Sequence, residues 1–263
     1  MADIVGRLLF QKPFREAWLA GHGCDLGLSE DHLRELETIN REELARTCRK
    51  IVSNLISGDL GANGGLRRAY PRLFKMLGER QIDAHSMIED FMCSPEFDAY
   101  REVHNDGPGL CVEEAFYIYL TTRPDCLECH PAMAALLEHE FLTALLSILV
   151  INREPAFRID TPLIRDNGVC YFAARTIQAD LVTYLGIERR CSGGEQVVTY
   201  LYAATRGRFI SGPVSPIVPE LIAFGSRNAA QLAGSDFVQR DGVIPVESDG
   251  LFDRMVQMGL IAP

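Results

Sequence analysis

The sequence predicts an α+β protein with two domains: an all-helical domain over residues 1–155 and a winged-helix-like domain over residues 156–263. Three observations lead to this prediction. A chain of 263 residues is long enough for two domains. Apolar residues recur at helical spacing throughout the first part. After Arg153-Glu154-Pro155, short apolar and aromatic runs typical of strands alternate with brief helical segments, in the outline of a winged helix.

In the first part, capping residues mark where helices begin. Ser29 precedes the helical segment EDHLRELETI, and Asn40 and Glu43 occupy the capping-box positions of NREELARTCRKIVSNLI. Ser94 followed by Pro95 is a further strong start signal. The segments EEAFYIYLTT and PAMAALLEHEFLTALLSILVI complete the helices. The glycine-rich stretch at 58–65 lacks the G-K-[ST] of a phosphate loop, so we interpret it as a connection.

In the second part, each element has a recognisable pattern. GVCYFAART (168–176) predicts a strand, and IQADLVTYLG (177–186) predicts a short helix ended by its glycine. QVVTYLYAAT (196–205) and RFISGPV (208–214), joined by Arg206-Gly207, predict a β-hairpin. PELIAFG and RNAAQLAG predict two brief helices, DFVQRDGVIPVE a wing or loop, and SDGLFDRMVQMGLI a final helix capped by Ser248 and stopped by Gly259.

The charge distribution bears on the class of partner. The formal net charge is −10, and residues 1–155 hold 16 basic against 25 acidic residues. Residues 156–263 are nearly balanced, with 10 basic against 11 acidic residues, and all ten cations are arginines. Nucleic-acid binding needs a basic surface, so we expect no nucleic-acid partner. Arginine suits planar recognition of carboxylates, which favours a peptide partner.

The sequence also predicts a cytoplasmic protein with no membrane partner. The N-terminal stretch, with Asp3 and only a short apolar run, is unlike a signal peptide. The longest apolar run, Phe141–Ile151, is too short to cross a bilayer, and its backward extension meets Glu138, His139 and Glu140. In the cytosol the eight cysteines would stay reduced, and we expect most of them to pack in the core.

One motif stands apart from this pattern, because residues 126–130 spell C-L-E-C-H. That spacing is used for covalent haem attachment, which is normally carried out outside the cytoplasm. A zinc site is the alternative, with Cys126, Cys129 and His130 as ligands and Cys111 or His139 as a fourth. A third interpretation is two loop thiols before a helix that begins at Pro131. We expect no metal in this chain, with the zinc site kept as an alternative.

Signatures of catalysis are scarce. The chain contains no H-E-x-x-H, no G-x-S-x-G and no G-x-G-x-x-G after a strand. A Cys–His pair from Cys111 and His104 has no local support. We therefore expect no catalytic residues in this chain.

The hairpin carries the candidate site. It combines aromatic residues, two guanidinium groups and an apolar strand that could accept a peptide by strand addition, with the arginines pairing acids. The candidate peptide-binding residues are Tyr200, Tyr202, Arg206, Arg208, Phe209 and Ile210, with Leu251, Phe252 and Met255 of the final helix. Alternatively the hairpin tip is a solvated surface, and residues 170–176 are a rival edge. A winged helix more often binds DNA through a basic helix, but the helices here are apolar or acidic.

Two stretches resemble a known family. GLSEDHLRELETINREELARTCRKIV, with LRRAYPRLFKMLGERQID and SPEFDAY after it, is similar to the helical domain of partner subunits of multinuclear non-haem iron peptide oxidases. QVVTYLYAATRGRFISGPVSPIVPELIAFG with LFDRMVQMGLI resembles the leader-peptide recognition element (RiPP recognition element) of such partners. The resemblance is closer to the thiaglutamate-type than to the methanobactin-type partner, and it rests on element order and apolar pattern.

The resemblance implies a non-catalytic subunit in ribosomal-peptide (RiPP) biosynthesis. It would bind the leader of a precursor peptide as an added strand and present a core cysteine to a TIM-barrel oxidase in a heterodimer. The iron would belong to that partner oxidase, with no cofactor in this chain. Two other hypotheses remain open: a DNA-binding winged-helix regulator, and a zinc-binding protein built on Cys126 and Cys129.

Overall fold

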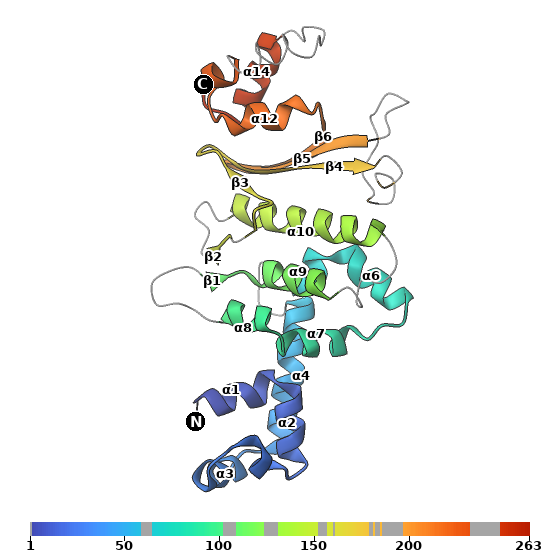
Figure 1. Ribbon diagram of the computed structural model, residues 1–263, viewed down its shortest axis with the longest axis vertical. Helices are drawn as coiled ribbons and strands as arrows, with labels where there is room; N and C mark the ends of the chain where they lie inside the picture. Colours follow the sequence, from blue (N-terminus) through green and yellow to red (C-terminus); the bar gives the residue numbers. More distant parts are fainter. Residues whose placement is uncertain are drawn as a thin grey trace. The chain divides into compact units, whose positions relative to one another are not determined.

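The protein is an α+β protein, mostly helical, with one four-stranded antiparallel sheet (Figure 1). A computed structural model describes residues 2–58, 65–101, 109–123, 131–151, 157–159, 161–178, 181, 185, 197–231 and 248–263. The chain divides into two compact units, Met1–Asn105 with Gly109–Cys126, and Asp106–Pro108 with Leu127–Pro263. The long helix at 131–151, which the sequence analysis grouped with the helical part, lies in the second unit.

The described elements of the first unit are helices and the two-residue strand β1. The elements are α1 (Ala2–Phe10), α2 (Lys12–Leu19), the 3-10 helix η1 (Gly23–Leu26), α3 (Glu30–Glu37), α4 (Arg41–Ser57), α5 (Gly65–Ala69), α6 (Pro71–Glu79), α7 (Ala84–Met92), α8 (Pro95–Arg101), β1 (Gly109–Leu110) and α9 (Val112–Thr122). Three of the predicted N-caps are confirmed. Ser29 accepts from the His32 N–H, Asn40 from the Glu42 and Glu43 N–H groups, and Ser94 from the Phe97 N–H.

A buried arginine holds the first helices together. Arg15 of α2 is 9% exposed and donates to the Leu8 carbonyl at 3.1 Å and to Glu89 of α7 at 3.2 Å. Lys12 also binds Glu89, at 2.8 Å, and this contact raises the pKa of the Lys12 ammonium. A buried charge is tolerated only when it is paired and hydrogen-bonded, and Arg15 meets both conditions.

The second unit is built on the sheet. Its elements are α10 (Pro131–Ile151), β2 (Phe157–Arg158), β3 (Arg165–Asp166), β4 (Tyr171–Gln178), β5 (Val197–Thr205), β6 (Arg208–Val214), α12 (Ile217–Ala223) and α14 (Ser248–Gln257). Residues 227–231 are also helical. The strand order is β3-β4-β5-β6, with Ala173 opposite Tyr202 and Ala203 opposite Ile210. The predicted hairpin 196–205/208–214 is confirmed for the described residues, Val197–Thr205 and Arg208–Val214.

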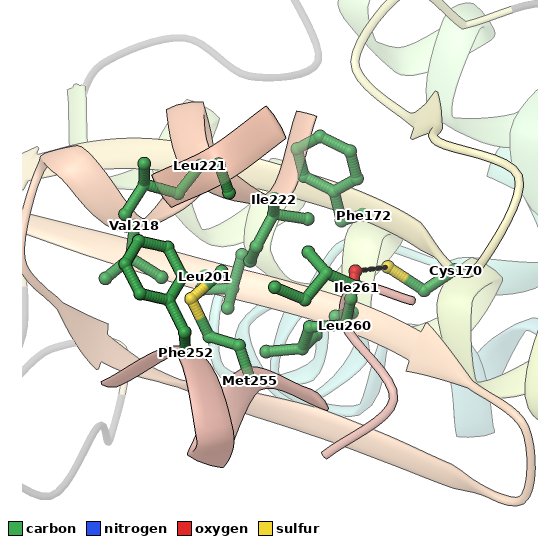
Figure 2. Close-up of a cluster of buried hydrophobic side chains, with 12 residues drawn as sticks. Cys170, Phe172, Leu201, Val218, Leu221, Ile222, Phe252, Met255, Leu260 and Ile261 are labelled. Carbon is green, nitrogen blue, oxygen red and sulfur yellow. Dashed lines mark hydrogen bonds between the residues drawn. The ribbon is translucent and has the colours of Figure 1, made fainter. Parts of the chain in front are cut away.

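Helices cover both faces of this sheet (Figure 1). On one face lies α10, whose His139 Nδ1 is 2.7 Å from the Tyr202 hydroxyl. On the other face, residues of β4, β5, α12 and α14 form one buried cluster (Figure 2). Its members are Cys170, Phe172, Leu201, Ala203, Val218, Leu221, Ile222, Ala230, Phe252, Met255, Leu260 and Ile261. We call these two sides the α10 face and the α12/α14 face.

A turn before β4 fastens the C-terminal helices to the sheet. Asn167 Nδ2 donates to the carbonyls of Ile222, at 2.6 Å, and of Leu260, at 2.9 Å. Its Oδ1 accepts from the N–H groups of Val169 and Cys170. One side chain thus satisfies carbonyl groups near the ends of α12 and α14, where helices leave backbone acceptors unpaired.

Two predictions need correction or comment. The short helix expected at 177–186 is wrong at its start, because Ile177 and Gln178 continue strand β4 opposite Val198 and Val197; most of the remainder lies outside the described residues. The wing or loop expected at 236–247 also lies outside them.

In α10, Ala132–Val150 is long and apolar enough to cross a membrane by length and composition, yet half of that stretch is buried, as in core helices.

Candidate peptide-binding site

Strand β6 is an edge strand whose outward backbone groups can be assigned from its turn. Arg206-Gly207 forms a two-residue turn that places Thr205 opposite Arg208, and Gly207 takes a φ of +102°. In such hairpins the pair next to the turn is hydrogen-bonded, and hydrogen bonding then alternates along the strand. Phe209, Ser211 and Pro213 therefore direct their backbone groups away from β5. Pro213 fits this assignment because it has no N–H to donate to β5.

The side chains of β6 divide between the two faces. Arg208, Ile210, Gly212 and Val214 lie on the α12/α14 face, because their partners include Leu201 and Ala203 of the buried cluster. Phe209, Ser211 and Pro213 lie on the α10 face. Ile210 and Val214 are partly buried against the cluster, whereas Arg208, Ser211 and Pro213 are exposed. The strand thus combines an outward backbone with partly covered apolar side chains.

Exposed arginines lie at the turn end of β6 and on the neighbouring helix α14. Arg206 and Arg208 are both exposed, and one Arg208 Nη donates to the Gln257 carbonyl at 3.0 Å. Arg254 of α14 is exposed as well. In the described part of the chain, no ion pair with a carboxylate is formed by these three arginines, whereas Arg227 is paired with Asp253 at 2.6 Å. These guanidinium groups can receive the carboxylates of a peptide.

The rival edge, strand β4, is covered for part of its length. Strand β3 pairs with Tyr171 and Phe172 at one end. Further along, the Arg175 Nη1 donates to the Ala174 carbonyl at 2.8 Å, and its Nε is bonded to Glu138 of α10. By the same alternation of hydrogen bonds along the strand, the Ala174 carbonyl points away from β5. The Arg175 guanidinium therefore already binds this outward acceptor of β4. In the described part of the chain, by contrast, no strand pairs with the outer side of β6.

Two of the predicted residues lie deep on the α10 face. Tyr200 and Tyr202 are 7% and 1% exposed, and their ring centroids lie 6.0 Å and 5.6 Å from that of His139. Burial, with the nearby Tyr200 and Glu138, raises the pKa of the Tyr202 phenol, which is thereby kept neutral. Their aromatic character serves the packing of α10 on the sheet.

The predicted residues of the final helix differ in exposure. Phe252 and Met255 are 3% and 2% exposed and belong to the buried cluster (Figure 2), so they pack beneath the candidate site and are not available for contact with a peptide. Leu251 is partly buried and lies closer to solvent. The structure brings Arg208, Ile210, Leu251, Phe252 and Met255 to the α12/α14 face, and Tyr200, Tyr202 and Phe209 to the other.

The alternative metal ligands are only partly described. Cys126, Cys129 and His130 lie outside the described residues, and so does His104. His139 faces Tyr202, and the buried Cys111 caps α9, its Sγ accepting from the Glu114 N–H at 3.4 Å. Burial raises the pKa of the Cys111 thiol, which disfavours the thiolate that metals bind. Within the described ranges, no group of three potential metal ligands occurs.

A pocket of about 330 Å³ opens on the α12/α14 face beside β4. Phe172, Ala174 and Thr176 of β4 line it, with Arg165 and Glu220 among the charged residues. Sequence patterns gave no signal for this pocket, because it forms between segments far apart in the chain. Pro213, by contrast, could have been recognised, since a proline within a strand pattern indicates an edge.

Comparison with protein-family models, with curated proteins and with solved structures finds no match for this chain.

Proposed function

We propose that this chain is a non-catalytic, peptide-binding subunit of an iron-dependent peptide oxidase in ribosomal-peptide biosynthesis. Its second unit would act as a winged-helix-like recognition element that holds the leader of a precursor peptide as a strand added to β6. The core cysteine of the precursor would then be presented to a TIM-barrel oxidase, which holds the iron.

The observation that carries this proposal is the open edge of β6. Strand addition needs outward N–H and C=O groups, and alternate side-chain positions then supply specificity. Phe209 and Ser211 offer both backbone groups, Pro213 offers a carbonyl, and Ile210 and Val214 offer apolar contact on one face. The exposed arginines at the turn favour an acidic peptide.

The oxidase partner rests on the resemblance described for the sequence, and on two supporting facts. The chain contains none of the catalytic motifs considered above. Its strong acidity disfavours the DNA-binding alternative, since phosphate backbones repel a surface of net negative charge.

The test is co-expression of the full chain with the precursor peptide and the oxidase encoded near its gene, followed by affinity purification and iron analysis. We expect a ternary complex in which iron depends on the oxidase. Ser211→Pro removes one outward N–H of β6 without removing a hydrogen bond to β5, and we expect it to lose the peptide while keeping the oxidase. Ser211→Thr keeps the N–H and is the matched control.

Two results would count against the proposal. Metal bound by the chain purified alone would turn attention to Cys126 and Cys129. Peptide affinity that is equal in Ser211→Pro and Ser211→Thr would remove β6 as the accepting strand.

A further inference from the structure

The middle of edge strand β6 has a glycine, Gly212, and therefore no side chain at that position. Gly212 lies between Ile210 and Val214 on the α12/α14 face, where both neighbours are partly buried. Its φ is outside the left-handed region, so the backbone does not require glycine there. Apart from its chain neighbours, no described atom lies within 4 Å of the position that a Cβ on Gly212 would occupy.

Neither backbone conformation nor packing against the described residues thus explains this glycine. Glycine inside a strand weakens it, and it often marks a place where a ligand or another backbone approaches closely. We call the space above Gly212, flanked by Ile210 and Val214 and lying beside the paired Leu201, the Gly212 gap.

An added strand would direct one side chain into this gap. Gly212 makes its hydrogen bonds to β5, so an antiparallel strand on the outer side would face it in a non-hydrogen-bonded pair. In such pairs the Cα atoms are only about 4.5 Å apart, and opposite residues share one face of the sheet. The gap is bordered by aliphatic side chains, Ile210, Val214 and Leu201.

We propose that Gly212 determines the specificity of this edge by admitting one large apolar side chain of the bound peptide. The inference rests on the proposed function, because it assigns the sequence preference of the same strand-accepting site. In an antiparallel strand, the residue opposite Arg208 follows the residue opposite Gly212 by four positions and lies on the same face. The preferred peptide therefore has a large apolar residue followed, four positions later, by Asp or Glu.

Pro213 restricts where the peptide pairs. Because Pro213 offers no N–H, the outward donors of β6 are those of Phe209 and Ser211, on the turn side of the strand. The arginines at the turn lie at this same end. Backbone pairing and charge therefore place the peptide in one register, with its apolar residue at the Gly212 gap.

The experiment is selection of a displayed library of random 12-residue peptides against three forms of the full chain: wild type, Gly212→Val and Ser215→Val. Valine at 212 fills the gap and favours the strand conformation, so we expect its thermal midpoint to equal or exceed that of the wild type. Ser215→Val is the matched control, because Ser215 is exposed and lies just past the end of β6, outside the residues that accept the peptide.

For the wild type and Ser215→Val we expect enrichment of a large apolar residue with an acid four positions later. For Gly212→Val we expect a small residue at the apolar position, with the acid retained. The same large apolar residue enriched by all three forms would overturn the Gly212 assignment while leaving strand addition intact. No enriched peptide with the wild type would overturn both the assignment and the proposed function.

Discussion

Single side chains in turns hold the second unit together. Asn167 satisfies two carbonyls and two N–H groups from one position in the turn before β4. Four hydrogen bonds exhaust most of the capacity of an asparagine side chain. The final residues return to the same place, since Ala262 donates to the Gly225 carbonyl and accepts from the Arg227 N–H.

We expect Asn167→Ala to lower the free energy of unfolding by about 2 to 3 kcal/mol, because it leaves partly buried acceptors without donors. Chemical denaturation followed by circular dichroism measures this change. Asp166→Ala is the matched control in the same turn, since it removes an acceptor from the exposed Gly168 N–H and should cost less than about 1 kcal/mol. Equal losses for the two variants would contradict the role of Asn167.

The thiol of Cys170 gives the second unit a dependence on alkaline pH. Burial raises the pKa of this thiol to about 12, and its Sγ donates to the Leu260 carbonyl at 3.5 Å. Above pH 9 the thiol ionises in the unfolded chain but stays neutral in the folded one. Stability that is fully present below pH 9 is therefore lost as the pH rises toward 12.

Ionisation of the Cys170 thiol alone lowers the free energy of unfolding by about 1.4 kcal/mol per pH unit in this range. This contribution is measured by comparing the unfolding free energies of the wild type and Cys170→Ala between pH 8 and pH 10.5. Other buried acids contribute equally to both proteins, so the difference is due to Cys170. We expect the wild type to lose stability more steeply than the variant above pH 9. Parallel curves would show that Cys170 ionises equally in both states.

At the scale of elements, the two edges of the sheet differ in how they are protected. Edge strands invite pairing with other chains, and proteins protect them with charges, prolines or covering segments. Strand β4 has β3 and the Arg175 guanidinium on its outer side, whereas among the described residues no strand pairs with the outer side of β6, which carries Pro213 at one end. This difference is what makes β6 the site of strand addition in our account.

Arg175→Leu should expose the outward Ala174 carbonyl and leave Glu138 without its partner. We expect this variant to self-associate through β4, which sedimentation velocity at increasing protein concentration would detect. Arg206→Leu changes an exposed arginine of the turn and should remain unchanged in sedimentation. If both variants sediment like the wild type, Arg175 does not protect the edge.

The end of α12 depends on a glycine for two separate reasons. Gly225 has a φ of +71°, and a Cβ there would lie 2.7 Å from the Asn167 carbonyl oxygen. Gly168 has a similar φ of +80° but open space around it. We expect Gly168→Ala to cost about 1 kcal/mol through backbone strain alone. Gly225→Ala should cost about 1 to 3 kcal/mol more, because a backbone atom must also shift; equal costs by chemical denaturation would contradict this.

Local patterns were sufficient for caps and turns but not for predicting which side chains of the sheet are buried. Ser29, Asn40 and Ser94 act on backbone groups within three residues, and Arg206-Gly207 closes a hairpin between adjacent strands, so sequence predicts them well. The burial of Tyr200 and Tyr202 under α10 depends on contacts more than fifty residues apart, which no local pattern encodes. In a strand with apolar residues on both faces, the sequence does not indicate which helix covers which face.

At the scale of the whole chain, the acidic residues and the proposed peptide-binding strand lie in different parts of the sequence. Residues 1–155 carry a net charge of −9, whereas residues 156–263, which include β6, are close to neutral and use only arginine as cation. An acidic peptide would therefore be repelled by the first part and received at the exposed arginines beside β6.

The measurement that tests the central claim most directly is residue-resolved amide hydrogen exchange of the full chain with and without its precursor peptide. We predict that the N–H groups of Phe209 and Ser211 become protected on binding, while those of Arg208, Ile210 and Gly212 are already protected in the free chain. A bound peptide that leaves Phe209 and Ser211 unprotected, or that instead protects Ala174 and Thr176 of β4, would contradict strand addition at β6.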